Sequence, residues 1–567
     1  MAGSTVFSVL DRSERNDVVI DRRTLLAAFL GAPAALGLGC RQTAEGDPPA
    51  IPPGELVGAS ADFGHLIRDG INVRIADADL EQRDVVIIGG GVAGLTAARR
   101  LRRAGLRNVT LLELESSIGG TAVSGTSSVA SFPWGAHYVP APRKDYPALV
   151  ELFDEMECFE GVDERGDPIP AEHLVARYPQ ERVFYKGSWY EGLYLQAGAD
   201  AADKQQFETF HNEIMKWVRW RDSAGKRAFT LPLEDGSRDD EPFQLDAVSM
   251  AQWMDDHNFS SPRLRWYADY ACRDDYGMRL EQTSAWAGIF YFASRTSSET
   301  EDSRPFITWP EGNGRIIDHL HNEVRDLAHA GWAVADVRPG RGEDKSQIDV
   351  VACSADGKQR RGIRCRRVIF AAPQFLTKYL IEDYRRSTPA HVATFEYGSW
   401  AVVNLHLASA PTSEGFPLAW DNVIYESPGL GYVAATYQRG LDYGPAIWTY
   451  YYPLTDADPK AARQRLLDVD REGWAEIALA DLSRPHQNIR EVTERVDVMR
   501  WGHAMILPKP GFISGVDRVR AAQPFRGIHF AHSDLSGVAL FEEAFYRGLR
   551  AAEDVLESLG RETERTV

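Results

Sequence analysis

The stretch Asp84–Gly94, DVVIIGGGVAG, decides the fold that we expect for this chain. Its apolar run Val85–Ile88 predicts a short buried strand of a parallel sheet. Gly89, Gly91 and Gly94 follow in the spacing GxGxxG. The first glycine permits a tight turn, the second lets the main chain approach a pyrophosphate, and the third lets helix and strand pack closely. The stretch therefore predicts a dinucleotide-binding unit.

The residues that follow complete this unit. We expect a helix at Val92–Arg103, whose positive N-terminal end faces the phosphates, and a second strand at Val109–Leu112. Glu113 ends that strand 24 residues after the first glycine, where a ribose hydroxyl needs an acceptor. Because strand, turn, helix, strand and acid occur in this order, the signal is much more specific than an isolated GxGxxG.

A glycine pair selects the cofactor. Gly119 and Gly120 follow Glu113 after a short turn. This arrangement resembles the flavin-containing monoamine and polyamine oxidase superfamily, in which an acid, a turn and Gly-Gly-Arg occur together. The resemblance implies FAD rather than a nicotinamide cofactor. It also implies an α/β fold in which a GxGxxG Rossmann-type FAD-binding domain is interleaved with an α+β substrate domain.

The resemblance covers roughly residues 84–558 and implies the domain boundaries. We expect a discontinuous FAD-binding domain at residues 84–140, 305–380 and 520–560. We expect the substrate domain at residues 141–304 and 381–519, with strands at Trp400–Leu407, Gly431–Tyr437 and Ala446–Tyr452.

One segment resembles the part of the family that lies against the flavin ring. It is Phe132–Val139, FPWGAHYV, which corresponds to the family's segment around a Gly-Gly or Gly-Ala pair. The resemblance implies that Gly135, Ala136, His137 and Tyr138 line the isoalloxazine.

Three later positions complete the implied cofactor site. Val337, in a predicted strand, stands where a main-chain group of the family commonly holds the adenine. Asp534 matches the acid of the family's strand F-A-G-x-acid and would contact the ribityl–pyrophosphate region, although His532 replaces the glycine. Phe541 begins a predicted helix, Phe541–Leu559, whose N-terminal backbone would stabilise negative charge at the flavin pyrimidine oxygen.

The chain departs from the amine oxidases at two positions. Many members carry a lysine near flavin N5 on the strand equivalent to Trp400–Leu407, but Val402 stands there, and Lys378 lies on another predicted element. Leu540 stands where the family has the tyrosine of its aromatic cage. We therefore expect the reduced flavin to react slowly with oxygen, and the electron acceptor to be oxygen or a quinone.

The segment Trp501–Met505 contains no cysteine, so we expect FAD to be bound non-covalently. His503 in this segment is the candidate catalytic residue. A histidine can be charged near neutral pH, so His503 or His137 could replace the missing lysine.

These features favour an FAD-dependent oxidoreductase that oxidises an amine, of polyamine or monoamine type, by hydride transfer to flavin. One alternative is a flavin desaturase or dehydrogenase of the phytoene-desaturase type, acting on C–C or ring substrates. Another is an exported flavin-bound binding protein without turnover. The formal net charge of −19 suits a cationic substrate and argues against nucleic acid.

Aromatic residues are dense in the predicted substrate domain and could wall a tunnel for a hydrophobic or cationic substrate. Packing in a core explains these residues equally well. They are Trp189, Tyr190, Trp217, Trp220, Trp253, Trp266, Tyr267, Tyr270, Trp286, Phe290 and Tyr291. The acidic stretch Asp235–Pro242 is expected to be a solvated surface loop.

The five cysteines form no CxxC pair, so neither a zinc site nor a redox pair is indicated. The N-terminus instead predicts export. Arg22 and Arg23 lie in a stretch that resembles a twin-arginine signal, and an apolar run too short for a comfortable membrane span follows. Leu36–Cys40 resembles a lipoprotein cleavage box, so residues 1–40 would be a signal and Cys40 a possible lipid anchor of a periplasmic protein. Residues 41–83 would be a tether, Gln42–Pro53, and a lead-in.

Overall fold

The computed structural model describes residues 50–561 and 564–566, apart from 59, 70–74, 77–78, 297–303, 344, 441–442 and 457. Residues 51–567 form one compact unit. The predicted signal, with Arg22, Arg23 and Cys40, lies outside the described residues, so export and lipidation stay predictions. No helix within the described residues is long and apolar enough to cross a membrane.

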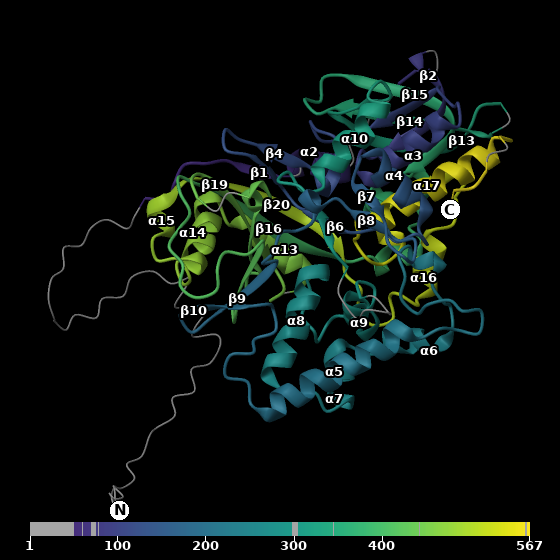
Figure 1. Ribbon diagram of the computed structural model, residues 1–567. Helices are drawn as coiled ribbons and strands as arrows, with labels where there is room; N and C mark the ends of the chain where they lie inside the picture. The colour runs from purple at the N-terminus through teal and green to yellow at the C-terminus, as the bar shows by residue number, and fades with distance from the viewer. Residues whose placement is uncertain are drawn as a thin grey trace, which may run out of the picture. The chain divides into compact units, whose positions relative to one another are not determined.

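One large sheet carries the glycine loop at the end of β2 (Figure 1). Its order is β12-β3-β2-β15-β14-β13, and β21 pairs with the last part of β15. The strands are β2 (Glu81–Ile88), β3 (Val109–Leu112), β12 (Ala328–His329), β13 (Trp332–Arg341), β14 (Gln347–Ser354), β15 (Arg360–Phe370) and β21 (Ile528–Phe530). Because β3, β2, β15 and β21 run parallel, their carboxyl ends meet at one edge, where nucleotides bind in such sheets.

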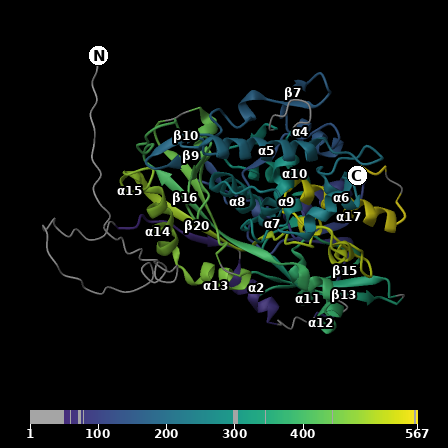
Figure 2. The ribbon, with the colours of Figure 1, turned by 90° about the horizontal axis from the view of Figure 1, so that it is seen from below.

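The second large sheet has eight strands in the order β1-β20-β16-β19-β18-β17-β9-β10. Figures 1 and 2 show the two sheets on different sides of the compact unit. The strands are β1 (Leu56–Gly58), β9 (Glu181–Tyr185), β10 (Ser188–Glu191), β16 (Tyr397–Leu407), β17 (Asp421–Ile424), β18 (Gly431–Ala434), β19 (Ala446–Pro453) and β20 (Thr493–Ile506). Most pairs are antiparallel, but β1 lies parallel to β20 and β17 lies parallel to β9. The remaining strands are short: β4 (Ser124–Thr126), β5 (Ser131–Pro133), β6 (Tyr138–Pro140), β7 (Phe159–Val162), β8 (Pro168–Pro170) and β11 (Phe306–Thr308).

Helices cover both sheets. The group α5 to α9 forms the lower part of Figure 1. The helices are α2 (Ala61–Arg68), α3 (Val92–Arg103), α4 (Pro147–Glu155), α5 (Ala201–Arg219), α6 (Asp240–Gln244), α7 (Met250–Asp256), α8 (Pro262–Tyr276), α9 (Ala285–Ala293), α10 (Gly314–Val324), α11 (Thr377–Leu380), α12 (Glu382–Arg386), α13 (Pro459–Asp468), α14 (Arg471–Leu482), α15 (Ile489–Val492), α16 (Val516–Ala521) and α17 (Phe541–Ser558).

The predicted helices α3 and α17 pack directly on each other, although they come from opposite ends of the described chain (Figure 1). A glycine at the crossing makes this possible. A Cβ atom at Gly548 would lie 2.4 Å from the carbonyl oxygen of Ala93 and 2.9 Å from Cβ of Thr96. The main chains of the two helices therefore approach as closely as only glycine allows.

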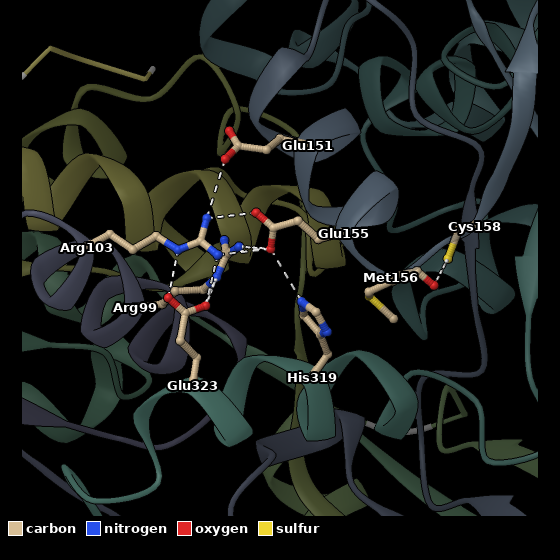
Figure 3. A network of polar contacts seen from close by, with 8 residues as sticks. All are labelled: Arg99, Arg103, Glu151, Glu155, Met156, Cys158, His319 and Glu323. Atoms are coloured by element: carbon tan, nitrogen blue, oxygen red, sulfur yellow. Dashed lines mark hydrogen bonds and ion pairs between the residues drawn. The ribbon is translucent and has the colours of Figure 1, made fainter.

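Ion pairs fix the C-terminal half of α3 between α4 and α10 (Figure 3). Arg103 contacts Glu155 at 2.7 Å and Glu323 at 2.7 Å, and Arg99 contacts the same two carboxylates. Burial acts to raise the pKa of Glu155, but hydrogen bonds and charge from Arg103 and Arg99 outweigh it and lower that pKa to about 2. Positive side chains near the C-terminus of α3 also interact favourably with the helix dipole. These ion pairs involve only the C-terminal half of α3, so they do not use its N-terminal amides.

Three sequence predictions about the elements are wrong in part. The strand expected at Gly431–Tyr437 ends at Ala434, because Ala435 turns away to pack with Phe132 and Ile447.

The acidic stretch Asp235–Pro242 is only partly a solvated loop. It leads into α6, and Pro242 is buried, because the apolar side chain of Phe243 packs on the core.

The expected tether also ends earlier than predicted. The carbonyl of Pro53 accepts a hydrogen bond from the Val496 amide at 2.8 Å, and that of Pro52 accepts one from Arg471 at 2.9 Å. Proline keeps its carbonyl acceptor, so Pro52 and Pro53 dock on the eight-stranded sheet, and β1 then adds its edge strand.

Candidate functional site

Packing alone requires two of the three motif glycines. Gly89 has φ +105°, and a Cβ atom there would lie 2.7 Å from the carbonyl oxygen of Ala371, which directly follows the neighbouring strand β15. A Cβ atom at Gly94 would lie 1.9 Å from the carbonyl oxygen of Gly89. The turn and the seat of α3 on the sheet therefore need glycine whether or not a nucleotide is bound.

Gly91 differs from these two, because space lies in front of it. The nearest atom to a Cβ at Gly91 is Cα of Gly120 at 3.8 Å. The first turn of α3 contains no acidic side chain, and no side chain caps the helix. The amide groups of this turn, which carry the positive end of the helix dipole, therefore face the space in front of Gly91. These residues fit the pyrophosphate of a dinucleotide such as FAD.

Glu113 lies beside the same loop, as predicted. Its carboxylate accepts hydrogen bonds from the amides of Gly90 at 2.6 Å and Glu115 at 2.8 Å. Burial raises its pKa, and these amide contacts oppose that rise. A carboxylate retains further lone pairs after two such bonds, so Glu113 can also accept the ribose hydroxyls. The Gly119 amide donates to Gly90 at 3.0 Å, which brings the predicted glycine pair against the loop.

The segment predicted to line the flavin is held rigidly by three strands of the eight-stranded sheet. Asn404 donates to the carbonyl of Pro133 at 3.1 Å, Trp501 to that of Trp134 at 2.7 Å, and Tyr451 to that of Gly135 at 2.9 Å.

The next carbonyls of this segment are bonded as well. The Asn313 amide donates to Ala136, Thr308 donates to His137 at 2.7 Å, and the Asn313 side chain donates to Tyr138 at 3.2 Å. Residues 133–138 are therefore fixed on both sides, as a surface that positions a rigid ring must be.

A pocket opens beside His137 and Tyr138, and we call it the acidic pocket. Its cavity volume is about 30 Å³, and it is lined mainly by aromatic rings and carboxylates. The aromatic residues are His137, Tyr138, Tyr270, Tyr291, Phe306, Trp420, Tyr432 and Tyr451, and the charged ones are Glu181, Asp274, Arg295 and Asp421.

Burial raises the pKa of Glu181 to about 7. Burial and the charge of Asp275 raise the pKa of Asp274, and burial with the charges of Asp274 and Glu181 raises that of Asp421. The charge of Arg295, which also lines the pocket, acts to lower the pKa of Glu181 and Asp274 but does not outweigh these rises.

The sequence reasoning missed these three acids. Asp274 lies in the aromatic stretch that the sequence singled out, but α8 also carries Asp269 and Asp275, so the sequence does not distinguish Asp274 from them. Glu181 and Asp421 begin short strands far apart in the chain, and only the pairing of β9 with β17 brings them together. No sequence signal announces that pairing.

The predicted aromatic tunnel is only partly present. Tyr270 and Tyr291 line the acidic pocket. Trp217, Trp220, Trp253, Trp286 and Phe290 pack instead in or against the large hydrophobic core. Trp189 is buried elsewhere, under the Arg182 guanidinium at 3.8 Å.

His503, the candidate catalytic residue, does not line the acidic pocket. Its ring stacks on Phe375 at 4.0 Å, and burial lowers its pKa to about 3. Burial likewise lowers the pKa of His137 to about 4. Both rings are thus neutral at pH 7, and neither supplies the positive charge that a lysine would bring.

Val402, which stands in place of that lysine, is buried between two cross-strand neighbours, Tyr451 on β19 and Met499 on β20. The Tyr451 hydroxyl lies 3.0 Å from Nδ1 of His137. The Tyr451 hydroxyl and the His137 imidazole, both neutral, therefore lie near Val402, where many family members have a lysine ammonium. Lys378 lies on α11 with its ammonium 5.0 Å from the Tyr379 ring and does not line the pocket.

Asp534 lies at the same sheet edge as the glycine loop, but its carboxylate already has protein partners. It accepts hydrogen bonds from the Tyr397 hydroxyl at 2.5 Å and the Gln374 amide at 3.0 Å, and it pairs with His532 at 2.9 Å. His532, which replaces the family's glycine, thus has a structural task. A contact between Asp534 and the ribityl chain stays a prediction.

Val337 and Phe541, which were predicted to contact the cofactor, have neighbours that bear on this role. Val337 is fully buried, pairs with Val350 and bridges to Ile381, so adenine binding by its main chain stays a prediction. Phe541 begins α17 after Leu540 as expected, but Glu542 and Glu543 follow at once and are buried. In their ionised form these two acids reduce the positive potential of the helix N-terminus, which was expected to stabilise the flavin oxygen.

Comparisons with known proteins agree with this geometry. The chain is 22% identical over 559 residues to the oxidoreductase PigB of Serratia sp. (strain ATCC 39006), covering 86% of this chain and 77% of that protein. A local match to the lysine-specific histone demethylase 1 homolog 3 of Arabidopsis thaliana, 39% identical over 70 residues, spans 12% of this chain and 4% of that protein.

Solved structures show the same fold. Wild-type putrescine oxidase bound to putrescine superposes with a TM-score of 0.59 at 18% identity, over 84% of this chain and 99% of that one. Cyclohexylamine oxidase from Brevibacterium oxydans IH-35A gives 0.58 at 15% identity, over 84% and 100%. The family model for flavin-containing amine oxidoreductases matches residues 92–556. The chain therefore belongs to the flavin-containing amine oxidoreductase family and is an FAD-dependent oxidoreductase.

Proposed function

We propose that this enzyme oxidises an amine that it binds as a cation in the acidic pocket. The observation that carries the proposal is the position of Glu181, Asp274 and Asp421 in the aromatic wall beside His137 and Tyr138. Amines are protonated near neutral pH, and both carboxylates and aromatic faces attract an ammonium group. An apolar polyene or ring would gain nothing from three half-buried carboxylates, whose desolvation is costly.

The protein's own part in the reaction is binding and positioning. When FAD is bound, it would supply the acceptor for a hydride from the carbon next to nitrogen, once the bound ammonium has lost a proton and the nitrogen lone pair is free to form the iminium product. The fixed segment 133–138 would orient the flavin ring, and the aromatic walls of the pocket would exclude water from the reacting carbon. We further propose that FAD is bound non-covalently, since Trp501–Met505 contains no cysteine.

Anaerobic reduction of the flavin tests the proposed function. Alkylamines mixed with the holoenzyme without oxygen should bleach the flavin absorbance at 450 nm, because a hydride passes to the ring. Polyenes and neutral cyclic hydrocarbons are the comparison. Bleaching by these compounds alone would indicate a desaturase, and no bleaching by any compound would indicate a flavin-bound protein without turnover.

We also propose that oxygen is a poor electron acceptor for this enzyme and that a quinone is a better one. Val402 supports this, because no ammonium stands there to stabilise the superoxide formed in the first electron step. We expect air-saturated buffer to re-oxidise the reduced enzyme in stopped flow roughly 10²-fold more slowly than a lysine-bearing relative, by analogy with the loss of one stabilising charge. A quinone analogue should restore rapid re-oxidation. Re-oxidation by oxygen alone at the rate of turnover would contradict this proposal.

A further inference from the structure

The lead-in that follows Pro53 and precedes the glycine motif is docked on the eight-stranded sheet at its start. There β1 pairs with β20, and the Glu55 amide donates to the Asp497 carboxylate at 2.8 Å. Gly54 lies so close to the sheet that a Cβ atom would lie 1.8 Å from the carbonyl oxygen of Val496. The first part of the lead-in is therefore held closely against the substrate half of the protein.

The next part of the lead-in, α2, packs on the sheet that carries the glycine loop. Its Phe63 ring is buried in a small apolar cluster with Ala333 and Ala335 of β13 and Val351 and Cys353 of β14. Alternate residues of the same two strands belong to the main core, so α2 covers their other face. Figures 1 and 2 show α2 between β20 of one sheet and β13 of the other. The lead-in thus connects the two sheets.

Between these two contacts, α2 begins on a carboxylate that another part of the chain supplies. Ser60 is the N-cap residue of α2, but its side chain does not cap its own helix. Its amide instead donates to Oε1 of Glu115 at 2.8 Å, and its hydroxyl donates to Oε2 at 2.7 Å. A carboxylate at the N-terminus of a helix interacts favourably with the positive end of the helix dipole. The start of α2 therefore offsets the negative charge of Glu115.

Glu115 belongs to the turn that holds the expected ribose acceptor, Glu113. The Glu115 amide donates to the Glu113 carboxylate at 2.8 Å, and the Glu115 carbonyl accepts from the Gly331 amide at 2.7 Å. Burial is the main cause of the raised pKa of Glu113, and the charge of Glu115 adds to it. The same turn closes on the glycine loop, where the Gly119 amide donates to Gly90. Glu115 thus places a second negative charge beside the loop that fits a pyrophosphate.

A pyrophosphate is itself negatively charged, and like charges brought together without compensation weaken binding. We infer that Ser60 is a positioning residue for FAD, which holds the Glu115 carboxylate against the N-terminus of α2 and so keeps an uncompensated negative charge away from the pyrophosphate. The lead-in is then part of the cofactor site, although it lies outside the strand–helix–strand unit that carries the motif. This inference rests on the family's cofactor and is independent of the substrate.

Flavin release from the holoenzyme tests the inference, with the Kd for FAD measured from flavin fluorescence across a salt series. Ser60→Ala should weaken the affinity for FAD about tenfold at 0.01 M salt and only about twofold at 0.5 M, because salt screens the charge of Glu115. Ser60→Thr keeps the hydroxyl and should bind FAD like wild type. Ser60→Asp keeps a good N-cap but repels Glu115, so it should weaken binding at least as much as Ser60→Ala.

A double variant separates the charge effect from a loss of packing. Glu115→Gln alone should change the affinity for FAD by less than about threefold, since the charge that it removes is already offset. Ser60→Ala with Glu115→Gln should bind FAD about as tightly as Glu115→Gln alone, because no charge is left to offset. Ser60→Ala with Glu160→Gln, which neutralises an exposed acid on β7, is the matched control and should keep the full defect.

Three results would overturn the inference. The first is unchanged affinity for FAD in both Ser60→Ala and Ser60→Asp at low salt. The second is a defect that neither salt nor Glu115→Gln relieves, because Ser60 would then act only by holding α2 in place. The third is equal relief by Glu160→Gln and Glu115→Gln, which would show a general effect of net charge. Melting temperatures of the cofactor-free variants show whether each chain is folded before its affinity is compared.

Discussion

Gly91→Val should yield a folded protein that is purified without flavin. The valine Cβ meets nothing closer than 3.8 Å, and Gly91 has φ −77° and ψ −171°, a conformation that β-branched residues adopt readily. The added side chain would instead fill the space that the pyrophosphate needs. Loss of two charge-assisted hydrogen bonds costs about 3–6 kcal/mol, which corresponds to roughly a 10²–10⁴-fold weaker affinity for FAD.

The measurement is the ratio of flavin to protein after heat release, with the cofactor identified by chromatography and folding followed by circular dichroism. Gly161→Val on β7, where space is also open, is the control and should keep its flavin. Gly94→Val should fail to fold, because its Cβ would lie 1.9 Å from a carbonyl oxygen. Near-stoichiometric FAD in Gly91→Val, or released NAD from wild type, would refute the assignment of this loop.

The second large effect concerns stability and does not depend on the reaction. Glu181→Gln should stabilise the cofactor-free protein at pH 8 and change little at pH 4. Burial raises the pKa of Glu181 to about 7 in the folded protein, against roughly 4.3 in an unfolded chain. The folded state thus retains its proton over this range, and the stability that Glu181 contributes falls as pH rises through it.

Above pH 7 the ionised carboxylate lowers the free energy of unfolding by up to about 3 kcal/mol, compared with the protonated carboxyl below pH 4. A neutral glutamine of the same shape does not lower it. Calorimetric melting temperatures of wild type and Glu181→Gln across pH 4–8 measure the difference. Parallel curves, or a variant that is less stable at pH 8, would mean that Glu181 has a partner in the folded protein. Glu160→Gln should give the wild-type curve.

The nucleotide half of the site could be predicted from the sequence because its geometry is local. Gly89, Gly91, Gly94 and Glu113 lie within one strand–helix–strand unit, and the turn requires their spacing. The structure places the elements of this unit where the sequence predicts them.

The substrate half could not be predicted, because it depends on pairing between distant strands. Nothing near Glu181 in the sequence indicates that Asp421 stands opposite it, and the aromatic residues of a pocket have the same composition as those of a core. His503 shows a related limit. The residue type suggested a charge, but stacking on Phe375 and burial keep the ring neutral.

The close packing of α17 on α3, at Gly548 and Ala93, has a consequence for biosynthesis. The sheet edge expected to receive the nucleotide includes β21, and the helix behind the glycine loop packs on α17, so both parts are synthesised long after the glycine motif. A nascent chain that already contains the complete GxGxxG motif therefore still lacks a wall of its cofactor site. We expect chains that end before residue 528 to bind no flavin, because they lack β21 and α17.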